Sequence, residues 1–319
     1  MRASLLVNLT LLVLLPWPQT QISTGSTAST DHQAMRRTPV VEVFETAKGS
    51  VVNIAATHLV QIQDRFGRID SIFEQLFDLP IRRPRTRQLK SVGSGFVLHP
   101  AGYIVTNAHV VARTVERNVI FDNQREYDAQ VIAMDREQDL AVLKIDVPQK
   151  LKPIRLGQSS DLMIGETVIA IGNPLGYQHT VTAGVVSALD RRIESGDEVL
   201  FDGLIQTDAP INPGNSGGPL LNVVAELIGI TTAIRPDAQN IGFAIPVDRL
   251  RELLPTMLDV ERRYRIRTGM RLDNLGQAKV QWVQVGGPAE VAGIQVGDII
   301  TQMDLQPVGG PIDYHIALL

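Results

Sequence analysis

The chain has 319 residues, a formal net charge of −4 at pH 7 and no cysteine. The absence of cysteine excludes disulfides, thiolate nucleophiles and Cys-ligated metal sites, and the weakly acidic charge gives no indication of a nucleic-acid-binding surface. Aromatic residues make up only 5% of the chain, whereas valine, isoleucine and glycine are plentiful, and this composition favours β-structure with many turns.

The N-terminus has the pattern of an export signal. One positive charge, Arg2, precedes a short apolar run over residues 3–15, an order that is typical of signal sequences. The run is shorter than the roughly 20 residues of a membrane-spanning helix. We therefore expect residues 1–26 to be a signal peptide, or an uncleaved membrane anchor, and the protein to be periplasmic or otherwise exported.

After a Ser/Thr-rich stretch, residues 40–44 have the pattern of a short helix and residues 50–55 that of a strand. Residues 58–90 lack a sustained pattern and carry several basic side chains, so we expect a long loop there. Short apolar runs separated by Gly, Pro and Asn then continue to residue 246, a spacing typical of an all-β barrel or sandwich. The predicted strands are residues 95–98, 103–106, 129–133, 141–145, 167–171, 227–231 and 242–245.

The pattern changes near residue 248. Residues 248–258 are amphipathic, because Leu250, Leu253, Leu254 and Leu258 share one helical face. A basic linker over residues 261–267 follows, and then a smaller unit rich in glycine. We expect a helix that closes the main domain, followed by a second, separate domain.

The strongest chemical signal is Gly-Asn-Ser-Gly-Gly-Pro at residues 214–219. A serine among glycines can sit on a sharp turn with its hydroxyl exposed, and the amides of Gly214 and Ser216 can converge on one point as an oxyanion hole. A glycine-rich turn alone is common. Ser216 is therefore a candidate nucleophile only if a base and an acid accompany it.

Among six histidines, His109 is the best candidate for the base. It is predicted to lie at the end of a buried strand, after small residues that leave room for the imidazole. His179 is its one competitor, in a loop after residue 173, whereas His99 is predicted at a hairpin tip. For the acid that orients the imidazole, Asp139 heads an apolar strand.

Two other aspartates compete for the role of the acid. Asp135 has the position of a turn residue, and Asp208 lies just upstream of the serine. The chain order His109, Asp139, Ser216 is that of the chymotrypsin arrangement, and it differs from the order in subtilisin and in the α/β-hydrolases. No metal-ligand spacing is present, so we expect neither a metal nor another cofactor.

Eight stretches of the chain carry a resemblance to a known family: residues 93–97, 102–109, 139–145, 165–174, 182–187, 206–209, 214–219 and 241–246. Through them the chain resembles the HtrA/Deg family of trypsin-like serine proteases over nearly all of residues 39–256. The resemblance implies two six-stranded β-barrels, as in chymotrypsin and trypsin, with the triad between them, and a C-terminal α+β PDZ domain. It also implies trimers assembled through the N-terminal part of the protease domain, and degradation of misfolded or unfolded proteins in the cell envelope.

The resemblance divides the chain into a protease domain over residues 39–256 and a PDZ domain over residues 262–319. It places the trimer contacts at Val40, Val41, Val43 and Phe44. The oxyanion-hole segment is then Gly214, Asn215 and Ser216. Apolar segments beside the serine favour cleavage after small or medium aliphatic residues, and the expected substrate-binding residues are Ile211, Asn212, Ile241, Gly242, Phe243 and Ala244.

The PDZ resemblance rests on residues 287–294 and 296–300, and it departs from the family in two ways. The loop that binds a peptide carboxylate would fall at residues 267–270, where the match is poor, and the chain stops at Leu319, before a closing strand. We therefore expect residues 262–319 to be loosely ordered and to bind C-terminal peptides weakly. The alternative is that the chain is a fragment of a longer protein with a complete domain.

Two functions fit these features. The first is a serine endopeptidase of protein quality control, acting through an acyl-enzyme on unfolded polypeptides. The alternative is a catalytically weak, chaperone-like or PDZ-type binding protein. The intact Ser-His-Asp set and the oxyanion glycines favour the peptidase.

Overall fold

The computed structural model describes residues 32–59, 88–112, 114–173, 179–195, 198–212, 214–234, 240–258 and 260–319. The chain divides into two compact units, Met1–Arg37 and Thr38–Leu319. Within the first unit, residues 32–35 form one helical turn, and the predicted signal segment, residues 1–26, lies outside the described residues. No helix among the described residues has the length and apolar character needed to cross a membrane.

The second unit begins with helix α2 (Pro39–Ala47), which confirms the helix predicted at residues 40–44. Pro39 stands in the first turn, where its missing N–H costs no helical hydrogen bond. Val43 and Ala47 lie one turn apart and are both buried, so they anchor the helix to the barrels. The 3₁₀ turn η1 (Lys48–Ser50) then leads into the first strand.

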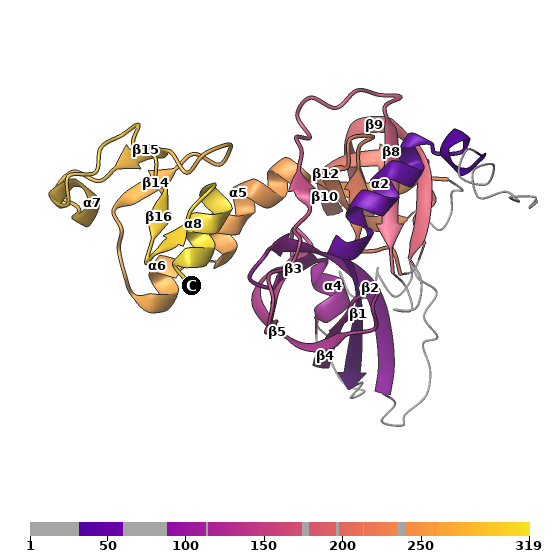
Figure 1. Ribbon diagram of the computed structural model, residues 1–319, viewed down its shortest axis with the longest axis horizontal. Helices are drawn as coiled ribbons and strands as arrows, with labels where there is room; N and C mark the ends of the chain where they lie inside the picture. The colour runs from indigo at the N-terminus through magenta and orange to yellow at the C-terminus, as the bar shows by residue number, and fades with distance from the viewer. Residues whose placement is uncertain are drawn as a thin grey trace, which may run out of the picture. The chain divides into compact units, whose positions relative to one another are not determined.

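Six antiparallel strands close the first barrel in the order β1-β2-β3-β6-β5-β4 (Figure 1). Alternate residues point inward, and Ile54, Ile104 and Leu143 are fully buried in its core. Four of the predicted strands lie within β2, β3, β5 and β6. The strands are β1 (Val51–Leu59), β2 (Gln88–His99), β3 (Tyr103–Thr106), β4 (Thr114–Ile120), β5 (Glu126–Asp135) and β6 (Leu140–Ile145).

The loop predicted at residues 58–90 was wrong at both of its ends. Strands β1 and β2 remain paired as far as Leu59 opposite Gln88, so both ends of the predicted loop are strand. Pairing with a neighbour supplies the backbone hydrogen bonds that a single strand lacks, and the local sequence carries no sign of this. Residues 60–87, the middle of the predicted loop, lie outside the described residues.

The second barrel is built from a sheet in the order β11-β8-β9-β10-β13-β12-β7. A further pairing of β11 with β12 closes six of these strands into a ring, while β7 pairs with β12 in parallel. Ile205, Leu220 and Ile228 lie in its core. The strands are β7 (Arg155–Leu156), β8 (Thr167–Gly172), β9 (Thr180–Ser195), β10 (Glu198–Thr207), β11 (Pro219–Leu221), β12 (Glu226–Ile234) and β13 (Gly242–Pro246).

Helix α5 (Val247–Leu258) follows β13 and confirms the predicted amphipathic helix. Leu250, Leu254 and Leu258 are at most 1% exposed, as their shared face requires. The short helix α6 (Val260–Tyr264) occupies the start of the predicted linker.

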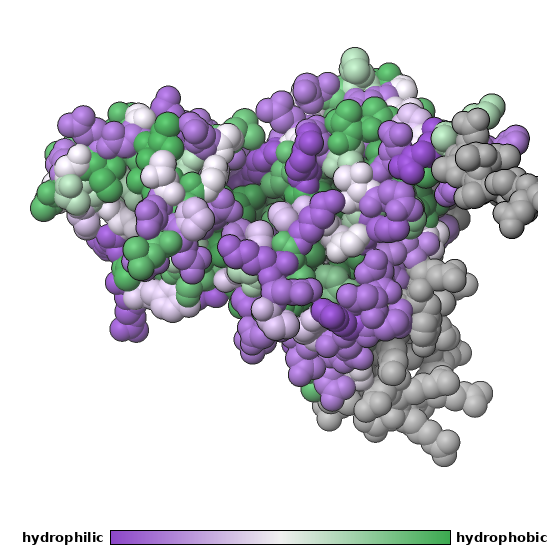
Figure 2. All heavy atoms as spheres, viewed as in Figure 1, coloured by the Kyte–Doolittle hydropathy of each residue, from purple (hydrophilic) through white to green (hydrophobic). Residues whose placement is uncertain are grey.

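The C-terminal residues form two small antiparallel pairs of strands and two helices around a core that includes Leu272, Val280 and Tyr314. Large apolar side chains are exposed in this part of the chain, and Figure 2 shows apolar residues at its surface; Val285 is 87% and Leu305 90% exposed. The elements are β14 (Met270–Leu272), β15 (Val280–Val283), α7 (Pro288–Val291), β16 (Gln302–Met303), β17 (Gln306–Pro307) and α8 (Pro311–Ala317).

Candidate active site

The segment before β11 forms the tight turn expected for the nucleophile. Gly214 and Gly217 have φ angles of +107° and +82°, which residues with a Cβ rarely adopt. A Cβ on Gly218 would lie 2.5 Å from the carbonyl oxygen of Ile171. Ser216, between these glycines, is 4% exposed, and its hydroxyl donates to the carbonyl oxygen of Thr232 at 3.3 Å.

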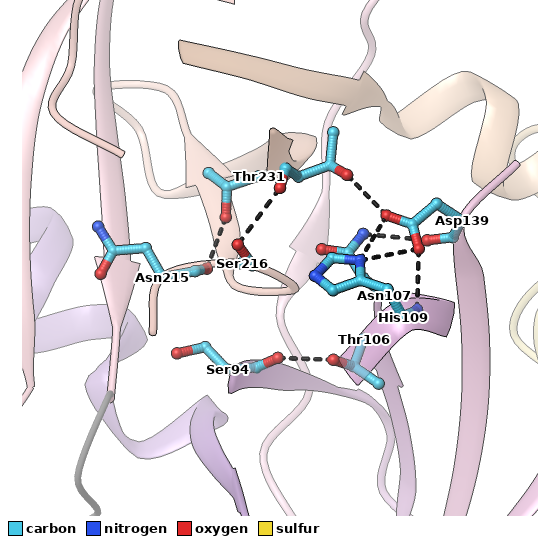
Figure 3. A network of polar contacts seen from close by, with 9 residues as sticks. Ser94, Thr106, Asn107, His109, Asp139, Asn215, Ser216 and Thr231 are labelled. Atoms are coloured by element: carbon cyan, nitrogen blue, oxygen red, sulfur yellow. Dashed lines mark hydrogen bonds and ion pairs between the residues drawn. The ribbon is translucent and has the colours of Figure 1, made fainter. Parts of the chain in front are cut away.

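Strand β12 holds this turn in place. The amide of Gly217 donates to the carbonyl of Thr231 at 2.8 Å, and the amide of Thr231 donates to the carbonyl of Gly218 at 3.0 Å. The Thr231 hydroxyl donates to the carbonyl oxygen of Asn215 at 2.7 Å (Figure 3). The backbone on both sides of Ser216 is therefore tied to one buried strand.

His109 lies in the four-residue helix α4 (Ala108–Val111), which follows β3. The prediction that it ends a strand was wrong, because β3 stops at Thr106 and helix α4 begins two residues later, after its N-cap Asn107. Its imidazole Nδ1 is 2.9 Å from both carboxylate oxygens of Asp139, and its backbone amide donates to Oδ1 of the same residue at 3.0 Å. In the view of Figure 3 the second ring nitrogen is on the side of Ser216.

Asp139 stands directly before β6, as predicted, with a φ of +52° and only 1% exposure. Its carboxylate also accepts a hydrogen bond from the hydroxyl of Thr232 at 2.7 Å. The side-chain amide of Asn107 donates to its carbonyl oxygen at 3.0 Å. A buried carboxylate with several donors around it has a fixed orientation, which is what holds an imidazole in one tautomer.

The other titratable candidates have structural contacts. His179 contacts the carbonyl of Val51 through Nε2 at 3.2 Å. Asp208 accepts from the amide of Val185 at 2.6 Å, and Asp135 accepts from the amide of Gln138 at 2.9 Å. Each of these bonds secures a turn or a strand end. The structure thus brings together His109 and Asp139 from the first barrel and Ser216 from the second.

The backbone amides beside Ser216 differ in their availability. The amide of Asn215 donates to the carbonyl of Asn212 at 3.0 Å within a turn. In the described part of the chain, the amides of Gly214 and Ser216 have no acceptor. Of the three predicted residues, these two can donate to a substrate oxygen, which is the arrangement of an oxyanion hole.

The predicted substrate-binding residues occupy two neighbouring segments. A Cβ on Gly242 would lie 2.6 Å from Cγ1 of Ile211, so these two residues are in close contact. Asn212 is exposed and Ile241 is half-buried. Phe243 and Ala244 are 4% and 0% exposed and pack in the barrel core.

Four residues of the site escaped prediction: Ser94, Asn107, Thr231 and Thr232. Each has a fully or almost fully buried polar side chain bonded to the segments around Asp139 or Ser216. For Ser94, Thr231 and Thr232 the one available signal was a polar residue inside a strand, and that signal does not identify the partner of the side chain.

Comparison with known proteins agrees with this geometry. Residues 93–230 match the trypsin-like peptidase domain, and residues 279–318 match the PDZ domain. A "Probable periplasmic serine endoprotease DegP-like" from Hahella chejuensis is 37% identical over 291 residues, which cover 84% of this chain and 61% of the relative. "Protease Do-like 1, chloroplastic" from Arabidopsis thaliana is 36% identical, and the match covers 92% of this chain and 67% of the relative.

The structure of an HtrA-type protease with a decapeptide has a TM-score of 0.57 and 31% sequence identity, and the match covers 88% of each chain. The present chain spans about three fifths of the length of the DegP-like relatives from Hahella chejuensis and Pseudomonas fluorescens. The fold is therefore that of a trypsin-like all-β protease followed by PDZ-type sequence, and the chain belongs to the HtrA/Deg family of serine proteases.

Proposed function

We propose that the protein is a serine endopeptidase that cleaves unfolded or misfolded polypeptides, with Ser216 as nucleophile, His109 as general base and Asp139 as its orienting acid. The observation that carries this proposal is the buried Asp139 carboxylate, which lies 2.9 Å from Nδ1 of His109 on the face opposite Ser216 (Figure 3). No cofactor enters this chemistry.

The geometry suggests how the reaction proceeds. Asp139 accepts a hydrogen bond from the Nδ1–H of His109, which leaves Nε2 as the proton acceptor. Rotation about the Cα–Cβ bond of Ser216 moves its hydroxyl from the Thr232 carbonyl to Nε2. The oxygen then attacks the scissile carbonyl, and the proton passes through His109 to the leaving amine. Water releases the acyl group by the same route.

The substrate carbonyl oxygen gains negative charge during each attack. The amides of Gly214 and Ser216 supply the donors that stabilise it, and they are already oriented before the substrate arrives. The contact between Ile211 and Gly242 supports a shallow apolar site for the side chain before the cleaved bond. We propose a preference for small or medium aliphatic residues in extended segments that add to a strand edge.

Three further proposals concern assembly, ligands and location. The exposed and half-buried apolar residues of α2 support a homotrimer contact at Val40, Val41 and Phe44, whereas Val43 is only 1% exposed and packs inside its own chain. A C-terminal peptide is the proposed ligand of the PDZ unit over residues 262–319. Export to the periplasm is supported by the N-terminal pattern and by relatives described as periplasmic.

The test is degradation of casein by the purified protein, with Ser216→Ala as its control. We expect wild type to degrade casein and Ser216→Ala to lose nearly all activity while it keeps the wild-type circular dichroism spectrum. Undiminished cleavage by Ser216→Ala would contradict the assigned nucleophile. A wild-type protein that suppresses aggregation of a denatured client without cleaving it would support the chaperone-like alternative.

A further inference from the structure

Ser94 makes two contacts with the turn that carries the nucleophile. It belongs to β2 of the first barrel and is fully buried. Its backbone amide donates to the carbonyl oxygen of Ser216 at 2.8 Å, and its hydroxyl donates to the carbonyl oxygen of Gly214 at 2.5 Å. Ser94 therefore holds the carbonyl of each residue whose amide supplies the proposed oxyanion hole.

The hydrogen bonds of the Ser94 hydroxyl fix its orientation. It accepts a hydrogen bond from the backbone amide of Asn173 at 2.8 Å, so its single proton is directed to the Gly214 carbonyl. The carbonyl oxygen of Ser94 itself accepts from the hydroxyl of Thr106 at 2.7 Å (Figure 3). Every polar group of this buried residue thus has a partner, which is the condition for a rigid polar contact.

The neighbouring glycines keep the strand close to the nucleophile turn. A Cβ on Gly93 would lie 2.6 Å from Cγ1 of Val110, and a Cβ on Gly95 would lie 2.8 Å from the carbonyl oxygen of Val105. Only glycine permits such close packing on both sides of Ser94. The strand backbone on both sides of Ser94 is therefore closely packed, and Ser94 cannot move away from Gly214 without disturbing the barrel core.

Gly214 needs such a contact because glycine alone does not select one conformation. Its φ of +107° sets the direction of its amide, and a bond to its carbonyl restricts rotation at the same Cα. We propose that Ser94 is a positioning residue for the oxyanion hole, acting through the carbonyls of Gly214 and Ser216. This inference rests on the proposed peptidase activity, and it names the residue that prepares the site for the transition state.

The test is Ser94→Ala in the full chain, which removes the hydroxyl and keeps the backbone amide. Loss of a direct oxyanion donor costs about 100- to 1000-fold in kcat, so we expect a smaller loss for a positioning residue, about 10- to 100-fold. KM for an aliphatic peptide substrate should stay within about twofold of the wild-type value, because the substitution leaves the proposed substrate-binding residues unchanged.

An inhibitor pair separates positioning from simple destabilisation. A peptidyl trifluoromethyl ketone forms a hemiketal with Ser216 whose oxygen is negatively charged, whereas the matching alcohol binds without any oxyanion. We expect Ser94→Ala to weaken binding of the ketone by the same factor by which it lowers kcat. Binding of the alcohol should stay unchanged. Ser94→Cys, which keeps a weaker donor, should retain an intermediate kcat, and it carries the test if the alanine variant fails to fold.

The matched control is Ser159→Ala, which removes another serine hydroxyl bonded to a backbone amide, that of Asp248 at 3.2 Å, at the start of α5. We expect wild-type kcat from this variant. Wild-type kcat and ketone inhibition in folded Ser94→Ala, or equal losses of ketone and alcohol binding, would overturn the assignment. An inactive wild-type protein would instead overturn the proposed function, and this assignment with it.

Discussion

The hydroxyl of Thr232 donates to Oδ2 of Asp139 at 2.7 Å, and both side chains are almost completely buried. Thr232 belongs to β12 of the second barrel, whereas Asp139 precedes β6 of the first. The carbonyl oxygen of the same threonine accepts from the hydroxyl of Ser216. One residue therefore contacts both the proposed acid and the proposed nucleophile, and it joins the two barrels at the site.

We predict that Thr232→Val lowers kcat about tenfold and leaves KM nearly unchanged. A hydrogen bond to a carboxylate contributes about 1.5–3 kcal/mol, and we expect only part of this free energy to be lost from stabilisation of the transition state. Valine keeps the volume of threonine, so the strand should pack as before. Steady-state kinetics on an aliphatic peptide substrate measures the effect.

Thr232→Ser is the matched control, since it restores the hydroxyl without the methyl group. It should recover most of the activity. Equal losses in the valine and serine variants would show that packing, and not the bond to Asp139, is what Thr232 contributes.

The Ser-His-Asp candidates were predictable because each stands in a local pattern: Ser216 among glycines, Asp139 before an apolar strand and His109 after one. Thr232 could not be found in this way. It lies 93 positions from its partner Asp139, and only the closure of two barrels brings them together. A threonine inside a strand is otherwise an ordinary β-former.

The fold, like the site, was predictable where a local sequence pattern marks an element and unpredictable where distant segments pair. Short apolar runs separated by turn residues predicted most of the barrel strands, whereas the long pairing of β1 with β2 depends on partner strands that a local pattern does not identify. Helix α4, which carries His109, has four residues, too few to show a helical period. The membership of the family, by contrast, rests on motifs that remain visible without any structure.

A second prediction concerns the proposed substrate pocket. Because a Cβ on Gly242 would meet Ile211 at 2.6 Å, Gly242→Ala should push that side chain into the site and narrow it. We expect kcat/KM to fall about tenfold or more for cleavage after Val or Ile, and less for cleavage after Ala, since one misplaced methylene costs about 1–3 kcal/mol.

Cleavage-site mapping by mass spectrometry and peptide kinetics check this shift. Gly49→Ala is the control, because a Cβ at that position meets nothing within 4 Å, and it should cleave as wild type does. An unchanged preference in folded Gly242→Ala would exclude Gly242 from the pocket.

A third prediction concerns stability and pH. Burial raises the pKa of Asp248, but hydrogen bonds from the amides of Ser159 and Ser160 and the charge of Arg251 outweigh it and hold the pKa below its ordinary value. A lowered folded pKa stabilises the fold above the unfolded pKa, and this stabilisation is lost as pH falls through the folded pKa.

Asp248→Asn should therefore lower the free energy of unfolding at pH 7 by about 1 kcal/mol, a value reduced for partial exposure. The difference from wild type should shrink below about pH 4, where the unfolded carboxyl begins to bind its proton. Urea unfolding at pH 7 and at acid pH measures both values. Asp122→Asn, at an exposed position, serves as the control, and a pH-independent difference would contradict the mechanism.

The last prediction concerns the PDZ unit. The carboxylate of Glu261 accepts hydrogen bonds from the backbone amide of Thr268, at 2.8 Å, and from its hydroxyl. Thr268 lies in residues 267–270, where the family resemblance places the carboxylate-binding loop although the sequence match is poor, next to Gly269 with its φ of +70°. In a peptide-binding loop at this position, the Glu261 carboxylate would occupy a donor that the C-terminus of a bound peptide uses.

Glu261→Ala should free that amide and remove a negative charge that repels the peptide terminus. We expect the Kd for a fluorescent peptide ending in a free aliphatic carboxyl residue to fall at least about fivefold relative to wild type, since one charge-assisted bond contributes about 1.5–3 kcal/mol. The same peptide with an amidated end should gain nothing. Glu290→Ala is the matched control, because Glu290 also accepts from a backbone amide, that of Gly286 at 2.7 Å, outside this loop. If both variants lowered the Kd equally, or if the amidated peptide also bound more tightly, the effect would come from the overall change in charge and not from release of the Thr268 amide.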